Sequence, residues 1–255
     1  MKDNFILTPY FLDKPLPGLV TIAGPDWQVN KTRLPNAPEQ LRMAALYEPL
    51  ARDVSAAIQS GNRPVSIAGD CCAAMGVAAG LQRAGVDPIL IWFDAHGDFN
   101  TRETSPSGFL GGMPLAMLVG RGEQTIPEAI GLKSLSEKQV FITDARDLDP
   151  GEKRGLEESN ITRLATVSDL IDYPLPPLPI HLHLDVDVIN PTVAPSVDYP
   201  APGGPDESQM ESVFRFLAGT GRIAAVSVST WNPELDKQGK TAEVCLNLLQ
   251  TILSG

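Results

Sequence analysis

Residues 93–101 read Phe-Asp-Ala-His-Gly-Asp-Phe-Asn-Thr, so the ligand-type side chains Asp94, His96 and Asp98 alternate. They follow the apolar run 88–93, which is too short for a typical helix and is typical of a buried strand. Side chains two apart at a strand end share a face, and the three groups are therefore expected to converge. Burying them uncompensated is costly, and a cation is the natural compensation. The segment predicts a metal site.

A second segment, 181–191, alternates polar and apolar residues and places His181, His183, Asp185 and Asp187 on one strand face. An amphipathic strand with a solvated acidic face is an alternative, and the two histidines could be hydrogen-bonded core residues. The closing Asn-Pro pair is a strand-ending turn signal, which favours a ligand-bearing strand end.

Two such strand ends suit a binuclear site, in which two ions about 3.5–4 Å apart share bridging carboxylates. Ligands rich in oxygen, with one imidazole, favour Mn²⁺ over Zn²⁺.

The charge, hydropathy and cysteine content of the chain exclude several classes of protein. A formal charge of −11 argues against nucleic acid or an anionic membrane as a partner. The sequence has no apolar run of membrane-spanning length and no signal pattern, so a cytoplasmic location is expected. Three cysteines, of which Cys71 and Cys72 are adjacent, do not make a disulfide framework. A chain of 255 residues can form a single α/β domain over 1–255.

The elements that must position these residues alternate along the chain. Strands are expected at 64–68, 88–94, 139–144, 181–188 and 223–229, and helices are expected up to about residue 85, at 206–216 and at 241–253. This order predicts a parallel sheet with helices on both faces and ligands at the carboxyl ends of its strands. The Pro-rich stretches 174–179 and 195–205 are interpreted as loops.

Three motifs in this order resemble the arginase (ureohydrolase) family from about residue 64 onward. The family's Gly-Gly-Asp-His is matched by Ala-Gly-Asp-Cys at 68–71. Its Asp-Ala-His-x-Asp-x-Asn is matched at 94–100, and its Ser-x-Asp-x-Asp-x-x-Asp-Pro at 183–191, with His183 for Ser and Asn190 for Asp. The resemblance implies a three-layer α/β/α sandwich around a mostly parallel, about eight-stranded sheet.

The resemblance also implies hydrolysis of a guanidino carbon by a hydroxide that bridges two Mn²⁺ ions. Asp94 and Asp185 would bridge the ions, and Asp98 and Cys71 would complete the ligands of one of them.

The ligands of the other ion would be completed by His96 and Asp187. Asp98 would be the catalytic residue, because it would accept a hydrogen bond from the hydroxide and pass the proton to the departing amine.

The substrate end resembles arginase more than agmatinase. Residues 146–152, Arg-Asp-Leu-Asp-Pro-Gly-Glu, match the segment with which arginases hold the α-amino group. Asp149 and Glu152 are the expected ammonium ligands, and Asn100 and Ser107 stand where the family binds the α-carboxylate. The alternative for this segment is an ordinary Asp-Pro-Gly turn followed by a helix start.

Three residues depart from the family pattern. Cys71 replaces a ligand histidine, and sulfur suits Mn²⁺ poorly, so that ion should bind weakly or the metal preference should shift. Gly111 occupies the place of a proton-shuttling histidine, and Thr230 that of a glutamate that pairs with the guanidinium. His183 is expected to support the ligands rather than bind metal.

Loss of the glutamate weakens the hold on a guanidinium, and glycine at position 111 is expected to leave room beside the reacting carbon. Both changes favour N-hydroxy-L-arginine, giving L-ornithine and hydroxyurea, over L-arginine, giving L-ornithine and urea. The alternatives are a catalytically inactive metal-binding homologue, a ureohydrolase for another guanidino compound, and a solute-binding or regulatory domain without metal. The expected partner is a small guanidino amino acid, and the sequence is also compatible with a homo-oligomer.

Overall fold

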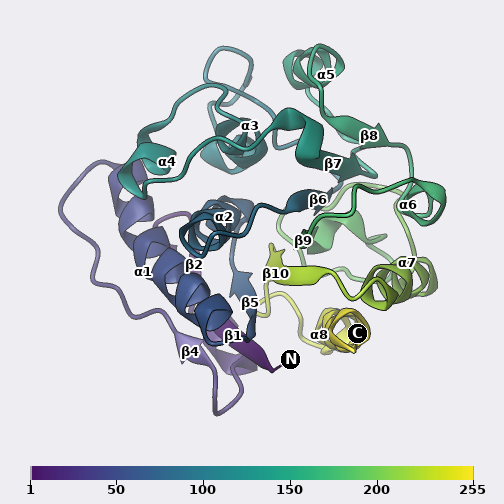
Figure 1. Cartoon of the computed structure of the whole chain (residues 1–255), viewed down its shortest axis with the longest axis horizontal. Coiled ribbons are helices and arrows are strands. Elements are labelled where there is room, and N and C mark those ends of the chain that lie inside the picture. Colours follow the sequence, from purple (N-terminus) through teal and green to yellow (C-terminus); the bar gives the residue numbers. More distant parts are fainter. Residues whose placement is uncertain (1, 255) are drawn as a thin grey trace.

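The computed structural model describes residues 2–254, and an eight-stranded sheet forms its centre (Figure 1). Every pairing in this sheet is parallel. In spatial order the strands are β4 (Gln28–Val29), β1 (Asp3–Thr8), β5 (Arg63–Ala68), β10 (Ile223–Ser229), β9 (Ile180–Asp185), β6 (Ile89–Phe93), β7 (Val140–Thr143) and β8 (Thr162–Leu164). The short strands β2 (Tyr10–Phe11) and β3 (Lys14–Pro15) pair separately as an antiparallel ribbon.

Helices cover both faces of the sheet (Figure 1). One face carries α1 (Glu39–Gln59), α2 (Ala74–Arg83), α3 (Pro114–Leu118), α4 (Thr125–Ala129) and α5 (Pro150–Glu157). The other carries α6 (Asp169–Asp172), α7 (Glu207–Gly219) and α8 (Lys240–Leu253). Short 3₁₀ turns are η1 (Pro17–Ile22), η2 (Cys71–Ala73), η3 (Leu110–Gly112), η4 (Glu137–Gln139) and η5 (Val186–Val188).

The sheet separates two hydrophobic cores. Along β6, Leu90 and Trp92 pack into the core beneath α1 and α2, whereas Ile89, Ile91 and Phe93 pack into the core beneath α7 and α8. A strand buried on both faces needs apolar residues at every position, which explains the continuous apolar run in the sequence. The three-layer α/β/α prediction is confirmed.

The predicted ends of the two strands that lead into the acidic segments were wrong. Strand β9 ends at Asp185 rather than at residue 188, because the Asp185 carboxylate accepts a hydrogen bond from the Asp187 amide at 2.8 Å and begins η5. Likewise β6 ends at Phe93, and Asp94 accepts from the His96 amide at 2.7 Å. Short acidic side chains that bond to nearby backbone compete with the strand ladder. These acids therefore converge through turns rather than through strand alternation.

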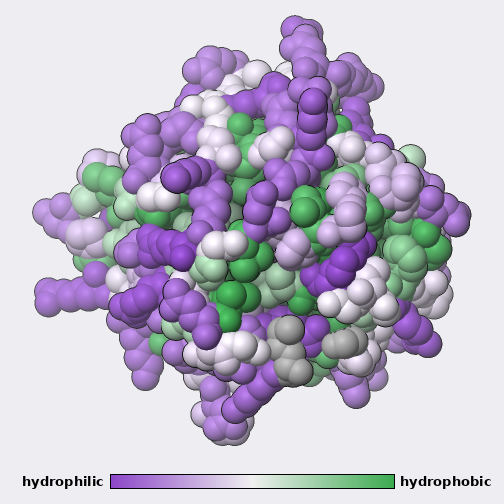
Figure 2. All heavy atoms as spheres, in the orientation of Figure 1, coloured by the Kyte–Doolittle hydropathy of each residue, from purple (hydrophilic) through white to green (hydrophobic). Residues whose placement is uncertain are grey.

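Figure 2 shows one face of the surface, on which hydrophilic residues dominate and apolar side chains occur in small groups. No helix within residues 2–254 is long and apolar enough to cross a membrane.

Candidate active site and metal centre

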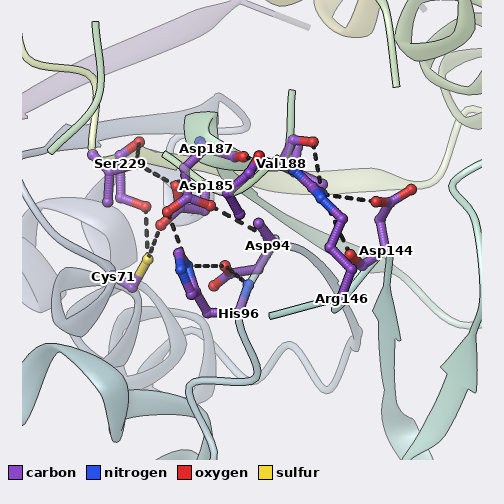
Figure 3. A network of polar contacts seen from close by, with 12 residues as sticks. Cys71, Asp94, His96, Asp144, Arg146, Asp185, Asp187, Val188 and Ser229 are labelled. Atoms are coloured by element: carbon purple, nitrogen blue, oxygen red, sulfur yellow. Dashed lines mark hydrogen bonds and ion pairs between the residues drawn. The ribbon is translucent and has the colours of Figure 1, made fainter. Parts of the chain in front are cut away.

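The site lies where four neighbouring strands end. In the sheet order β5-β10-β9-β6, each strand delivers a polar side chain at or just beyond its carboxyl end: Cys71 after β5, Ser229 at the end of β10, Asp185 at the end of β9 and Asp94 after β6 (Figure 3). Parallel strands all end at the same edge of a sheet, so residues far apart in sequence meet there.

Two sets of side chains have the spacing of metal ligands. Cys71, Asp94 and Asp185 form the first set and Asp94, His96 and Asp187 the second; within each set, one potential ligand atom per residue lies within 4.8 Å of the others. Asp94 belongs to both sets, as a bridging carboxylate would. Asp185, the other predicted bridge, belongs only to the first.

Local hydrogen bonds point Cys71 into the site. The Asp70 side chain accepts from the Cys72 amide at 2.9 Å and caps η2. The turn brings the Cys71 Sγ to 2.8 Å from Asp185 Oδ2, whereas the Cys72 Sγ lies 3.7 Å from the Leu110 carbonyl oxygen. Burial, followed by the charge of Asp185, raises the pKa of the Cys71 thiol.

The two buried histidines of β9 form a line of contacts below Cys71. His181 Nε2 and His183 Nδ1 each lie 2.9 Å from the Ser227 Oγ, and His183 Nε2 lies 3.3 Å from the Cys71 Sγ. The His183 ring stacks on Trp92, with centroids 3.7 Å apart. Burial lowers the pKa of His181 to about 3 and also lowers that of His183, so both rings are neutral. His181 is thus a hydrogen-bonded core residue.

His96 lies between two carboxylates. Its Nδ1 is 3.1 Å from Asp187 Oδ2 and 3.5 Å from Asp94 Oδ1. Burial alone would lower its pKa, but the hydrogen bonds to Asp187 and Asp94 outweigh burial and raise the pKa to about 12. The imidazolium therefore supplies the positive charge that these acids need, a role that a metal ion would take over.

The surroundings of Asp98 indicate whether the site can accommodate a cation. It is 5% exposed, its φ is +50°, and its Oδ2 has no hydrogen-bond partner among the residues the structure describes. Burial, then the charges of Asp94 and Asp185, raise its pKa. A residue with a positive φ and a buried carboxylate oxygen without a partner raises the free energy of the folded state unless a ligand compensates for it. The site fits a cation, although Asp98 itself belongs to neither ligand set.

A cavity of about 220 Å³ opens at this site. Its acidic lining residues are Asp70, Asp98, Asp147, Asp149, Glu152, Asp185 and Asp187. No Lys or Arg lines it within the described part of the chain, so the cavity suits a cationic ligand.

The predicted substrate ligands are brought together here. Asn100, Ser107, Asp149 and Glu152 all line the cavity, and the Asn100 Nδ2 donates to Asp149 Oδ2 at 3.0 Å. Both Glu152 oxygens already accept backbone bonds, from Phe99 at 2.8 Å and from Asp149 at 3.2 Å. The turn and helix start that sequence analysis offered as the alternative do occur, as a capping box at the start of α5.

The space expected beside Gly111 is filled, which corrects that prediction. A Cβ at this position would lie 2.4 Å from the Phe109 ring. Phe109 in turn packs against Phe11 and Tyr199, with centroid distances of 6.2 and 5.4 Å, and all three rings line the cavity. This aromatic group was not predicted from the sequence, because its members come from separate segments without a shared motif.

Two other residues hold the site in shape. Thr230, at φ +62°, donates its hydroxyl hydrogen to Asp185 Oδ1. Arg146 donates to Asp144 Oδ1 at 2.8 Å and to the backbone oxygens of Asp187 and Val188 at 3.3 and 3.1 Å (Figure 3). This role of Arg146 was not predicted from the sequence, because its partners lie in an irregular loop.

Comparisons with known proteins agree with this geometry. Residues 21–255 match the arginase family. The arginase of Bacillus subtilis is 32% identical over 243 residues, covering 89% of this chain and 82% of the relative, and that of Bacillus caldovelox is 34% identical over 229 residues, covering 82% and 75%. The crystal structure of the B. subtilis arginase superposes with a TM-score of 0.84 at 27% identity, covering 100% of this chain and 99% of the other.

Proposed function

The chain belongs to the arginase family of hydrolases that cleave guanidino C–N bonds, and on this premise we propose that it is a binuclear amidinohydrolase for an arginine-like amino acid. The observation that carries the proposal is the sharing of Asp94 by two sets of ligands at the base of an acidic cavity. A shared carboxylate can hold two ions close enough together to act on one substrate.

The donor sets fit two divalent ions, of which Mn²⁺ is the family's ion. Asp94, His96 and Asp187 would hold one ion, and Cys71, Asp94 and Asp185 the other. When bound, the pair lowers the pKa of water, so that a nucleophile is available near neutral pH.

Asp98 is proposed to move the proton. Its unpartnered Oδ2 can accept a proton from the attacking water and deliver it to the amine nitrogen as the guanidino C–N bond breaks. Its raised pKa suits a group that must hold a proton between these events. Trp92 Nε1, which donates to Asp94 Oδ2 at 2.9 Å, keeps the neighbouring carboxylate oriented.

The amino-acid end of the substrate is proposed to lie against Asp149, Asn100 and Ser107. The Asp149 carboxylate would pair with the α-ammonium group, and the Asn100 and Ser107 side chains would bind the α-carboxylate. Glu152 has both oxygens engaged with backbone amides, so it contributes charge and holds the loop that carries Asp98. Burial raises the pKa of Glu152 to about 7.

The reacting end of the substrate would lie near Thr230 and Phe109. Thr230 offers no negative charge, which favours a guanidine less basic than that of arginine. We therefore place N-hydroxy-L-arginine, giving L-ornithine and hydroxyurea, ahead of L-arginine, giving L-ornithine and urea. L-arginine is the second candidate because the relatives are named arginases. The filled space beside Gly111 no longer contributes to this preference.

The test is product release from a panel of guanidines by the metal-loaded protein. N-hydroxy-L-arginine and L-arginine should release hydroxyurea or urea with ornithine, and agmatine and guanidinobutyrate should react far more slowly. Asp149→Asn should lower kcat/KM for the amino acids by an amount equivalent to roughly 2–5 kcal/mol in activation free energy. Guanidinobutyrate turnover should change little, because that compound has no ammonium group for Asp149 to bind. Faster turnover of agmatine than of every α-amino acid would contradict the substrate class, and no turnover with both ions bound would favour an inactive homologue.

A further inference from the structure

We propose that Cys71 and His183 make one of the two metal positions selective for a thiophilic ion, Zn²⁺ or Co²⁺, so that the chain holds a mixed metal pair. The inference rests on the proposed binuclear site and concerns which ion occupies each half. It is carried by the contacts around the Cys71 sulfur and by the contrast between the two ligand sets.

The Cys71 sulfur is placed as a ligand and not as a packing group. It is 4% exposed, belongs to the first ligand set, and lies 2.8 Å from Asp185 Oδ2 and 3.0 Å from the Ser229 Oγ. Asp98, whose buried Oδ2 has no hydrogen-bond partner among the described residues, lines the same cavity, and this is independent evidence for a cation there. Thiolate ligands select zinc-type ions over Mn²⁺.

The adjacent Cys72 provides an internal comparison. It is as deeply buried as Cys71, but its sulfur faces the Leu110 carbonyl and it belongs to neither ligand set. The cap that Asp70 forms on η2 separates the two thiols, one toward the acids and one toward the core. Only Cys71 can therefore give the site its sulfur.

His183 supports the thiolate by a hydrogen bond. The Ser227 hydroxyl has one hydrogen to share between His181 Nε2 and His183 Nδ1, both 2.9 Å away. When that hydrogen goes to His183 Nδ1, the neutral ring carries its own hydrogen on Nε2, which lies 3.3 Å from the Cys71 Sγ and can donate to it. Such donors to a metal-bound ligand tune affinity by about 10–100-fold. Two residues 112 positions apart thus form one unit.

The second position has no sulfur. Asp94, His96 and Asp187 offer carboxylate oxygens and one imidazole, a donor set that suits Mn²⁺. Zn²⁺ binds most mixed donor sets more tightly than Mn²⁺ does, so the distinguishing quantity is the ratio of the two affinities at each position. That ratio should be larger at the Cys71 position.

Cobalt absorption tests the sulfur ligand directly. Metal-free protein titrated with Co²⁺ should develop a near-ultraviolet thiolate-to-cobalt charge-transfer band. The band should persist in Cys72→Ser and in Cys245→Ser, the matched controls, and disappear in Cys71→Ser while the second position still binds cobalt. Circular dichroism establishes that each variant is folded. The presence or absence of the band in the unmodified protein tests the sulfur ligand even if a variant does not fold.

Metal competition tests the selectivity. Protein dialysed against mixtures in which Mn²⁺ increasingly exceeds Zn²⁺ should pass through a range in which it retains both ions, as measured by elemental analysis, because the second position exchanges zinc for manganese at a smaller excess. Cys71→His should exchange retained zinc for manganese, and His183→Gln should weaken zinc retention by about 10–100-fold without changing manganese at the other position.

The opposite results are equally clear. Two bound cobalt ions without a thiolate band, or a Cys71→Ser protein with an unchanged zinc-to-manganese ratio, would overturn the inference and leave the binuclear hydrolase intact. Failure to bind any divalent ion would overturn both.

Discussion

Asp94 is the residue that the two proposed metal positions share. One oxygen accepts from Trp92 Nε1 at 2.9 Å and the other from the His96 amide at 2.7 Å, so the carboxylate is held before any ligand arrives. Burial and the charge of Asp187 raise its pKa to about 6. A carboxylate that is fixed, buried and close to another acid is prepared for a cation.

Replacing this shared ligand should therefore empty both positions. Asp94→Asn is expected to abolish retention of two ions after dialysis, together with turnover, whereas Asp185→Asn should chiefly affect the Cys71 position. Elemental analysis of dialysed protein measures the outcome, with the exposed Asp172→Asn as control. Full metal content in Asp94→Asn would contradict the assignment of Asp94 as the bridge.

Gly111 offers a second prediction at the residue scale. A Cβ there would lie 2.4 Å from the Phe109 ring, so Gly111→Ala should lower the free energy of unfolding by roughly 1–3 kcal/mol. Gly112→Ala is the matched control, since nothing lies within 4 Å of its Cβ position. In a Phe109→Ala background the cost at position 111 should largely vanish, which a double-mutant cycle by urea unfolding would reveal. Equal costs in both backgrounds would show that Phe109 is not the obstacle.

At the scale of elements, the loop after β9 depends on one guanidinium. Arg146 joins the end of β7 to residues 187–203 through Asp144, Asp187 and Val188, and it also donates to the Ala201 oxygen at 3.1 Å. A planar fork can serve several acceptors at once, and an ammonium cannot. The loop carries the proposed metal ligand Asp187 and the cavity residue Tyr199.

Arg146→Lys should consequently weaken metal binding at the His96 position and destabilise the fold by about 1–3 kcal/mol, although Arg146 belongs to neither proposed ligand set. Isothermal titration with Mn²⁺ and urea unfolding are the measurements. Arg215→Lys on α7, whose side chain is 74% exposed, is the control. Unchanged metal affinity would mean that the loop is held by its other contacts.

The elements also show what a sequence can predict. Strands β5, β6 and β10 were identified because strands buried on both faces appear as apolar runs. Strand β1 and helix α1 were not identified; Pro49 inside α1 interrupts the usual helical pattern. The end of β9 was misplaced because the Asp185 side chain bonds the backbone ahead of it.

The same limit applies to the site. The order of the motifs along the chain was enough to predict that the candidate ligands lie together, because parallel strands all end at the same edge of the sheet. The contact of Cys71 with His183 and the position of Phe109 over Gly111 depend on rotamers and packing between distant segments, which no local pattern encodes.

At the scale of the whole molecule, the site makes stability depend on pH. Burial raises the pKa of Asp94 to about 6 and of Glu152 from 4.5 to about 7, and the neighbouring acids raise that of His96 from 6.5 to about 12. In each case the folded state holds its proton more tightly than the unfolded state. The resulting stabilisation is complete below the unfolded pKa and is lost as pH rises through the folded one.

The metal-free protein should therefore melt at a lower temperature as pH rises from about 5 to 8, and added Mn²⁺ should restore stability most at the higher pH. Glu152 alone accounts for up to about 3 kcal/mol of this loss. Calorimetry in chelator measures the slope, which Glu152→Gln should flatten and Glu157→Gln, an exposed change on the same helix, should not. A melting temperature that climbs with pH in chelator would contradict this linkage.

The position of β10 has a consequence for how the protein is made. This strand is the last of the sheet in the chain, yet it lies between β5 and β9 at the centre. During synthesis β5 and β9 are therefore made before the strand that pairs with both of them. Until β10 is made, their apolar faces and unpaired backbone edges are exposed to other nascent chains. The Cys71 and Ser229 side chains, 158 residues apart, meet only after β10 has inserted. Because β10 separates β5 from β9, the proposed ligand set of Cys71, Asp94 and Asp185 is expected to be complete only after β10 has inserted, and a nascent chain that ends before residue 223 should depend on chaperones.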